Sequence, residues 1–365
     1  MPESRSPTLH DVAVAAGVSA ATVSRHRRGV RTFEPQVVAR IESAIERLGY
    51  RDHPAARSLA TGRTGTVGLV VLDLANPHFT SLLHGAHRVA AEHGLSLAFV
   101  DTAESRAPER QLVEALARRV DGLIVSARLA GGAVDWIARL GKPVVFFGRL
   151  SLPGWHSVSA DGVAAARLLG AHLASLGHRR VAYLDFAGSR WSAERRRSLK
   201  RVLTAAGGSL QVHAVDAPGA EAGETVAAPV LLQPESTRPT AVVGYNDLIA
   251  VGFMHEARRL GFNVPQQVSV AGFDDIEGAR HVVPALTTVA MHSAEQGAMA
   301  MQRLIEAMAG RLTAPVDETL PPRLVLRDST RPPAQTQSQS QPSQSPPLFR
   351  SLSPSKSPSR RKPAP

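Results

Sequence analysis

The most constraining feature of this sequence is a regular alternation of short apolar runs with longer amphipathic segments after Thr66. Strands of about four to seven residues that alternate with helices of about ten or more are typical of a parallel sheet covered on both faces. A first set of apolar runs lies at residues 67–73, 95–101, 121–127 and 143–148, and a second set lies at 181–186, 241–246 and 268–275. Two α/β lobes are therefore expected over residues 66–330.

The amphipathic segments between these runs predict the helices of the two lobes. Apolar residues recur there at helical spacing, which favours helices with one buried face. The expected positions are near 78–93, 107–119 and 132–140, from about 192, and near 247–260 and 294–309. Crossovers of the chain between the lobes are expected near 150–160, 283–292 and 310–322.

The first 50 residues predict three short helices instead of strands. Thr8, with Asp11 three residues on, resembles a capping box. Ser19 is the expected N-cap of a second helix that runs from Ala20 to about residue 28, and Pro35 suits the first position of a third. A helix, a tight turn through a glycine and a second helix form the helix-turn-helix layout, so DNA binding is the expected function of this segment.

The positive charge of the chain is concentrated at its two ends. Of a net charge of +11, residues 1–63 carry +4 (10 Arg against 6 acids) and residues 331–365 carry +6 (6 Lys and Arg, no acid). This distribution is typical of nucleic-acid-binding appendages on a near-neutral body, although basic tails also serve solubility alone. Pro, Ser and Gln make up 23 of the 35 residues of the tail, which we expect to be disordered.

The sequence lacks residues and motifs that several classes of enzyme and metal site need. There is no cysteine, the nucleophile motif Gly-x-Ser-x-Gly is absent, and Gly62, Gly65 and Gly68 precede a strand where a dinucleotide fingerprint would follow one. His84 and His87 share a helix face without a nearby carboxylate, so a structural role is favoured over metal binding. We therefore expect no enzymatic activity, no metal and no cofactor. No run of about 18 apolar residues occurs, which favours a soluble cytoplasmic protein.

Eight motifs, in order and with consistent spacing, resemble one family. They read TLHDVAVAAGVSAATVSR, IERLGYR, ARSLATGRTGTVGLVVLDLANPHF, RRVDGLIVS, GHRRVAYL, PTAVVGYNDLIAVG, VPQQVSVAGFDD and LTTV. Together they resemble the lactose/galactose-repressor family of bacterial transcription regulators. The resemblance implies an N-terminal helix-turn-helix headpiece over 1–50, a hinge helix over 51–65, a two-lobed periplasmic-binding-protein-like α/β core with parallel sheets over 66–330, and a basic tail over 331–365.

The resemblance also implies which residues meet DNA. Ala20, Ala21 and Arg25 match the base-reading positions, where small side chains allow close approach and an arginine can bond guanine. Leu59 matches a minor-groove wedge, although it could instead pack on the core. Phosphate and flanking contacts are expected from Thr8, Ser19, Thr22, Ser24, His26, Arg28, Ala56 and Arg57.

Three departures from the family pattern affect these expectations. The run His26-Arg27-Arg28 stands where the family usually has Val-Leu-Asn, so it favours phosphate affinity over sequence choice. His53 stands where the hinge usually has an Asn cap, and Glu34 replaces a Ser before the third helix.

A small effector is expected in the cleft between the lobes, where strand C-termini meet. The matching positions are Asp73, Asn76, His78, Phe79, Arg149, Asp161, Arg195, Asn246 and Asp274. Carboxylates, amides and arginines around an aromatic face suit a sugar or a nucleobase-like heterocycle. Sugar is favoured, although Gly148 replaces an Asp that many sugar-binding members carry and His78 replaces an aromatic. Asp161 and Asp275 could instead be helix caps, and Asp73 a turn residue.

The function expected is thus a repressor that binds a palindromic operator as a homodimer under effector control. No leucine heptad follows residue 330, which favours a dimer over a tetramer. Two alternatives share the α/β core. A solute-binding protein would lack the headpiece, and a metabolic enzyme would need a nucleophile, metal or cofactor motif.

Overall fold

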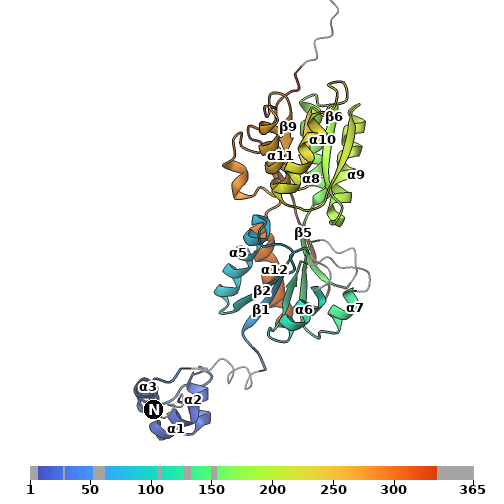
Figure 1. The fold of residues 1–365 in the computed structure, drawn as a ribbon. Coiled ribbons are helices and arrows are strands. Elements are labelled where there is room, and N and C mark those ends of the chain that lie inside the picture. The colour runs from blue at the N-terminus through green and yellow to red at the C-terminus, as the bar shows by residue number, and fades with distance from the viewer. Residues whose placement is uncertain are drawn as a thin grey trace, which may run out of the picture. The chain divides into compact units, whose positions relative to one another are not determined.

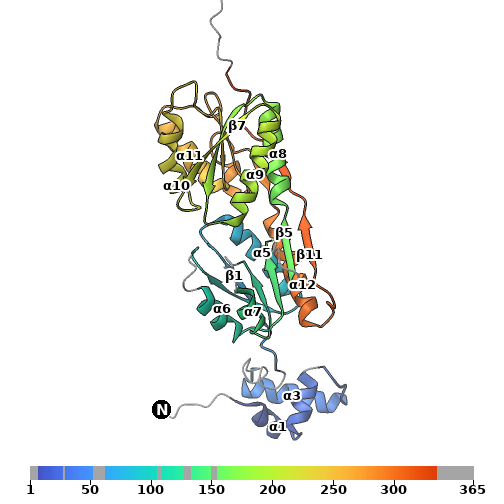
Figure 2. The same cartoon turned by 90° about the vertical axis from the view of Figure 1, so that its right-hand side faces the viewer.

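A computed structural model describes residues 7–27, 29–51, 62–104, 109–126, 133–148 and 154–334. The headpiece, the two lobes and their labelled elements are drawn in Figures 1 and 2. Among the described residues, none of the helices combines the length and the apolar character needed to cross a bilayer.

The headpiece contains the three expected helices: α1 (Leu9–Ala16), α2 (Ala20–Arg27) and α3 (Pro35–Leu48). Thr8 and Asp11 form the predicted capping box at the start of α1, and the backbone N–H of Thr22 donates to Ser19 Oγ over 3.1 Å. Gly17, in the left-handed region at φ +66°, ends α1 and turns the chain toward α2. A core of Val12, Ala13, Ala16, Val23, Ile41 and Ala44 holds the three helices together.

The first lobe is built on a six-stranded parallel sheet, with the strand order β11-β5-β4-β3-β1-β2. The strands are β1 (Thr66–Val71), β2 (Ser96–Asp101), β3 (Leu123–Val125), β4 (Val144–Phe147), β5 (His156–Ala160) and β11 (Asp317–Leu320). Helices α5 (Pro77–Glu92) and α12 (Ser293–Met308) cover one face, and α6 (Glu109–Ala117) and α7 (Ala133–Ala138) cover the other. Leu69 and Val70 show why both faces are apolar, because successive side chains of β1 enter opposite cores.

The second lobe repeats this design with four parallel strands in the order β7-β6-β8-β9. These are β6 (Arg180–Phe186), β7 (Ser209–Val215), β8 (Ala241–Gly244) and β9 (Ser269–Ala271). Helices α10 (Ala220–Leu231) and α11 (Asp247–Arg259) cover one face, and α8 (Gly162–Ser175) and α9 (Arg190–Ala205) cover the other. The 3-10 helix η1 (Glu277–Arg280) follows β9, and β10 (Thr288–Ala290) pairs antiparallel with β12 (Arg323–Val325). Two lobes with parallel sheets confirm the predicted fold class.

Two segments expected only as crossovers contain strands. β5 and β11 pair in parallel at the edge of the first sheet, and the chain changes lobe just after them, at residues 161 and 321–322. Both strands are polar: the Ser157 hydroxyl donates to Asp317, and Ser159 Oγ lies 3.2 Å from Thr319 Oγ1. Because these buried hydroxyls find partners on the neighbouring strand, the sheet edge forms without the apolar run by which the other strands were predicted. The elements α8, β7 and α10 were not predicted either.

The remaining crossover, near residues 283–292, returns the chain to the first lobe. It leads into α12, which packs along α5. The two helices touch backbone to backbone: a Cβ added at Gly85 would lie 1.8 Å from the Ala294 carbonyl oxygen, and one at Gly297 would lie 2.0 Å from that of Leu82. Only glycine permits this approach, so the helix pair depends on both residues.

A Gly85→Ala substitution is therefore expected to push α12 off α5 and to lower the free energy of unfolding by roughly 2–3 kcal/mol. Urea denaturation measures this loss. Gly278→Ala is the matched control, because a Cβ there meets nothing within 4 Å. Equal stability of the two variants would show that the helix pair can relax around a methyl group.

The described C-terminal segment is fastened to the second lobe. Ser329 Oγ donates to the carbonyl of Val270 over 2.6 Å, and the buried His178 lies with Nε2 2.9 Å from the carbonyl oxygen of Arg331 and Nδ1 2.9 Å from Thr240 Oγ1. The ordered chain thus continues past residue 330, where the tail was expected to begin. The rest of the predicted tail, from residue 335, lies outside the described residues.

Burial lowers the pKa of His178 to about 4, against 6.5 for an ordinary histidine. The unfolded chain therefore takes up this proton first as the pH falls below about 6.5, and the stability held by neutral His178 is lost between pH 6.5 and about 4. His178→Gln should be less stable at pH 7.5 but should lose about 2 kcal/mol less stability on acidification to pH 4.5. Denaturation curves at both pH values measure this, with the exposed His281→Gln as control. Parallel pH profiles for wild type and His178→Gln would contradict it.

Candidate functional site

Helix α2 of the headpiece exposes the residues that were predicted to read bases. Ala21 and Arg25 are exposed one turn apart and Ala20 is half-buried, while Val23 on the opposite side is fully buried against α1 and α3. The buried anchor fixes the rotation of the helix, so that the small side chain and the guanidinium share one outward face. Such a face fits the major groove.

The hydroxyl groups predicted to contact phosphates make local hydrogen bonds. Ser19 Oγ lies 2.9 Å from Thr22 Oγ1 and caps α2, and Thr8 is engaged with Asp11 in the capping box of α1. Ser24 is half-buried on α2. These bonds fix the start of both helices, and a phosphate contact by any of these hydroxyls stays a prediction.

His26 is half-buried and contacts the third helix of the headpiece. Its Nε2 lies 2.7 Å from Glu42 Oε1 on α3, and its ring meets the edge of Phe33 at 6.5 Å between centroids. The contact holds the end of α2 against α3, and a phosphate contact by His26 stays a prediction. Arg28 and the hinge residues Ala56, Arg57 and Leu59 lie outside the described residues, as does His53.

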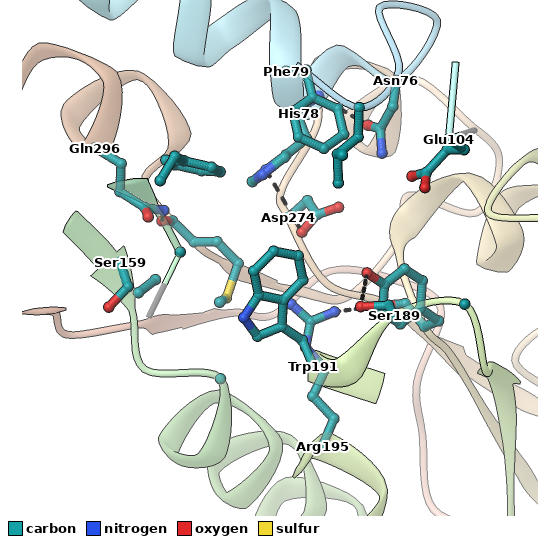
Figure 3. A pocket seen from close by; sticks show the side chains of 18 residues that line it. Asn76, His78, Phe79, Glu104, Ser159, Ser189, Trp191, Arg195, Asp274 and Gln296 are labelled. Carbon is teal, nitrogen blue, oxygen red and sulfur yellow. Dashed lines mark hydrogen bonds and ion pairs between the residues drawn. The ribbon is translucent and has the colours of Figure 1, made fainter. Parts of the chain in front are cut away.

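A pocket lies between the two lobes at the C-terminal ends of their strands (Figure 3). It encloses about 1070 Å³ of empty space, counted out to its open mouth. Of the nine predicted effector residues, five line it: Asn76, His78, Phe79, Arg195 and Asp274. The remaining lining is Leu72, Glu104, Phe147, Gly148, Ser159, Ala160, Gly162, Gly188, Ser189, Trp191, Tyr245, Met291 and Gln296.

The first lobe contributes an uncharged histidine set among aromatic rings. Asn76 caps α5 by accepting the N–H of His78 over 3.0 Å, which fixes the imidazole between Phe79 and Phe147. Burial lowers the pKa of His78, and the Asp274 carboxylate only partly opposes this. The ring is therefore neutral near pH 7, with Nδ1 2.7 Å from Ser293 Oγ and 3.8 Å from Asp274 Oδ1 across the cleft.

Arg195 is the buried cation of the pocket, and its side chain comes from α9 of the second lobe. Its guanidinium lies 4.4 Å from the Phe273 ring centroid and 5.2 Å from that of Tyr245, and one terminal N–H donates to the Tyr245 carbonyl over 2.6 Å. Within the described part of the chain, no acceptor reaches Arg195 Nε, although the residue is only 7% exposed. A buried donor without an acceptor is costly, so this N–H favours binding of a polar ligand.

Asp274 projects from the loop after β9 with a left-handed backbone, at φ +113°. Burial raises the pKa of its carboxyl group, against the opposing effects of His78 and Arg195. Asp247 stabilises the loop from behind, because its carboxylate accepts the Thr288 hydroxyl at 2.6 Å and the Ile276 N–H at 3.0 Å. A buried, strained carboxylate is typical of a functional site.

The structure does not bring three predicted effector residues into the lining. Asp161 caps α8 by accepting the Ala164 N–H, and Asp73 accepts the N–H of Ala75 in a turn. These are the alternative roles, helix cap and turn residue, that the sequence allowed for the two residues. Asn246 caps α11 and donates to the Pro218 carbonyl over 2.7 Å. Asp275 pairs with Arg327 and caps no helix. Arg149 lies outside the described residues.

Sequence reasoning missed the aromatic wall of the pocket. Tyr245 directly follows the apolar run of β8, and its hydroxyl donates to Ser189 Oγ over 2.9 Å. Trp191 is the second residue of α9, and Gln296 lies on the first turn of α12. Two of these pocket residues could have been predicted, because Tyr245 follows the end of a strand and Gln296 follows an expected crossover. Within the described residues, no group of three or more His, Asp or Glu side chains is arranged to hold a metal ion.

Because burial raises the pKa of Asp274, the folded state holds this proton more tightly than the unfolded chain, and stability is lost as the pH rises from about 4 through the raised pKa. Asp274→Asn is expected to raise the free energy of unfolding at pH 7, because the amide avoids the cost of burying a charge. Asp275→Asn is the matched control with the opposite expected sign, because it breaks the ion pair with Arg327. Thermal unfolding of both variants tests this, and a destabilised Asp274→Asn protein would contradict it.

Two family models match the chain. The model for bacterial regulatory proteins of the lacI family matches residues 8–53, and the model for a periplasmic binding protein-like domain matches residues 171–330. The first spans the three-helix headpiece and the second spans most of the second lobe with the C-terminal part of the core.

Known proteins match over nearly the whole length. The transcriptional regulator GalS of Salmonella typhimurium is 32% identical over 88% of this chain and 96% of its own, and catabolite control protein A of Priestia megaterium is 30% identical over 89% and 99%. The Lac repressor dimer bound to operator and the anti-inducer ONPF is similar in structure, with a TM-score of 0.81 at 25% identity over 90% of this chain and 100% of that one. The regulator CelR in complex with cellobiose gives 0.65 at 27% over 88% and 99%. This chain therefore belongs to the LacI family of bacterial regulatory proteins.

Proposed function

We propose that this chain is a transcriptional repressor that binds a palindromic operator as a homodimer and responds to a small effector in the pocket between its lobes. The observation that carries the proposal is the outward face of α2, where Ala21 and Arg25 are exposed over the buried anchor Val23. The Lac repressor, a structural relative, binds its operator as a dimer. We propose action in the cytoplasm, where operator DNA is found.

The pocket supports regulation by a ligand. A buried Arg195 N–H, the Asp274 carboxylate and the amide of Gln296 surround a space walled by aromatic rings. Such groups pair with the hydroxyls of a sugar or the edges of a nucleobase, while the rings cover the flat faces. The CelR structure holds cellobiose, which favours a sugar here. We propose ligand binding without catalysis, because Ser293 Oγ and Asp274 Oδ1 both lie near the same nitrogen of His78, Nδ1, at 2.7 and 3.8 Å. A catalytic triad needs its nucleophile and its carboxylate on opposite ring nitrogens.

Arg25→Ala is expected to weaken binding to the preferred operator by roughly 1–3 kcal/mol while leaving binding to random DNA nearly unchanged, because a base contact carries sequence information. Fluorescence anisotropy with the DNA upstream of the gene, at a fixed salt concentration, measures both affinities. Arg47→Ala is the matched control, because it removes the same charge from an exposed site on α3. Equal losses of Arg25→Ala on both DNAs would overturn the base-reading role.

The effector half of the proposal is tested by thermal shift with cellobiose, ribose, galactosides and nucleobases. A ligand at 100 times its dissociation constant adds about 2.7 kcal/mol to the stability of the folded state. By linkage, a ligand that weakens operator binding must also bind less tightly to the DNA complex.

A further inference from the structure

Trp191 belongs to one lobe by sequence and to the other by its contacts. It is the second residue of α9, which packs on α8 and on β6 and β7 of the second lobe. Its indole nevertheless packs against the apolar cluster of the first lobe, which contains Phe79, Val145 and Phe147. The side chain therefore bridges the cleft.

The place that receives the indole is Gly148, at the end of β4. The backbone N–H of Gly148 donates to the Val158 carbonyl over 2.8 Å, so the sheet fixes its position, and its φ of +91° suits glycine. A Cβ added there would lie 2.4 Å from Trp191 Cζ2 and 3.2 Å from Cη2. Carbon atoms do not approach to 2.4 Å without a bond, so the indole occupies the volume of a side chain at position 148. A side chain such as Asp therefore does not fit at position 148 beside Trp191.

The same ring also lines the pocket, close to Arg195 and Ser189 (Figure 3). One side chain is thus both a contact between the lobes and a wall of the space between them. The polar contact across the cleft, between His78 Nδ1 and Asp274 Oδ1, spans 3.8 Å and is longer than a hydrogen bond. Trp191 lies so near Gly148 that no Cβ would fit between them.

We propose that Trp191 is the residue that couples the contents of the pocket to lobe closure: its indole seats on Gly148 when the lobes are closed, and a ligand in the pocket acts on closure by contacting or displacing it. Any side chain at position 148 then holds the lobes apart. The inference rests on the proposed function, because the seat has a regulatory role only if an effector binds in the cleft.

The chain contains three tryptophans, so a Trp136→Phe/Trp155→Phe protein reports on Trp191 alone. Adding Gly148→Ala is expected to release the indole to solvent, with a red shift of its emission and an increase of about twofold or more in acrylamide quenching, because the ring loses its apolar contacts. Gly154→Ala is the matched control: Gly154 has a similar φ of +96°, and a Cβ there meets nothing within 4 Å. Unchanged emission and quenching in Gly148→Ala would overturn the proposal.

A second measurement remains informative even if backbone strain at position 148 lowers the stability of the Gly148→Ala protein. The shift in melting temperature caused by Gly148→Ala is compared in the Trp191 protein and in a Trp191→Ala background. Strain at position 148 is common to both, so a larger loss with Trp191 present isolates the clash with the indole. Equal losses would overturn the proposal. Neither measurement uses DNA, so failure of wild-type operator binding would contradict the proposed function without affecting these results.

Discussion

The contact between α5 and α12 is the constraint on which the pocket depends. Gly85 and Gly297 let the two backbones touch, and this fixes α12 on the first lobe although it enters directly from the second. The start of α12 then lies beside the start of α5. As a result, Ser293 meets His78 across 215 positions of sequence, and Gln296 reaches the pocket. A wider helix pair would separate the groups that form the first-lobe wall.

The electrostatics of the pocket follow from its burial. Arg195 is surrounded by aromatic rings and a carbonyl, Asp274 is held in a strained loop, and His78 is kept neutral by its surroundings. The Nε–H of Arg195, which lacks an acceptor within the described residues, and the buried carboxyl group of Asp274 both carry a cost of burial. Sites of this kind are stable enough to persist because the sheets behind them are well packed, and they gain free energy when a ligand supplies the missing partners.

Much of the fold was predictable, since Val- and Leu-rich runs such as those of β1 and β8 are buried on both faces and leave a clear pattern. β5 and β11 were not, because their buried Ser157 and Ser159 are satisfied only by the partner strand. Five pocket residues followed from the family resemblance, which places the effector where strands end. Asp161 and Asn246 share that position but cap helices instead, a choice made by local hydrogen bonds. Trp191 was missed because its seat, Gly148, lies on the other lobe.

The three crossovers mean that neither lobe is a continuous stretch of chain. The first lobe receives β11 from residues 317–320, and the second receives β12 from residues 323–325. During synthesis, the first sheet therefore gains its edge strand β11, and the second lobe gains its β10–β12 pair, only after the last part of the core has left the ribosome. The headpiece is continuous and can form its core from residues 9–50 as soon as they emerge. On a nascent chain, the DNA-reading unit is thus complete well before the unit that senses the ligand.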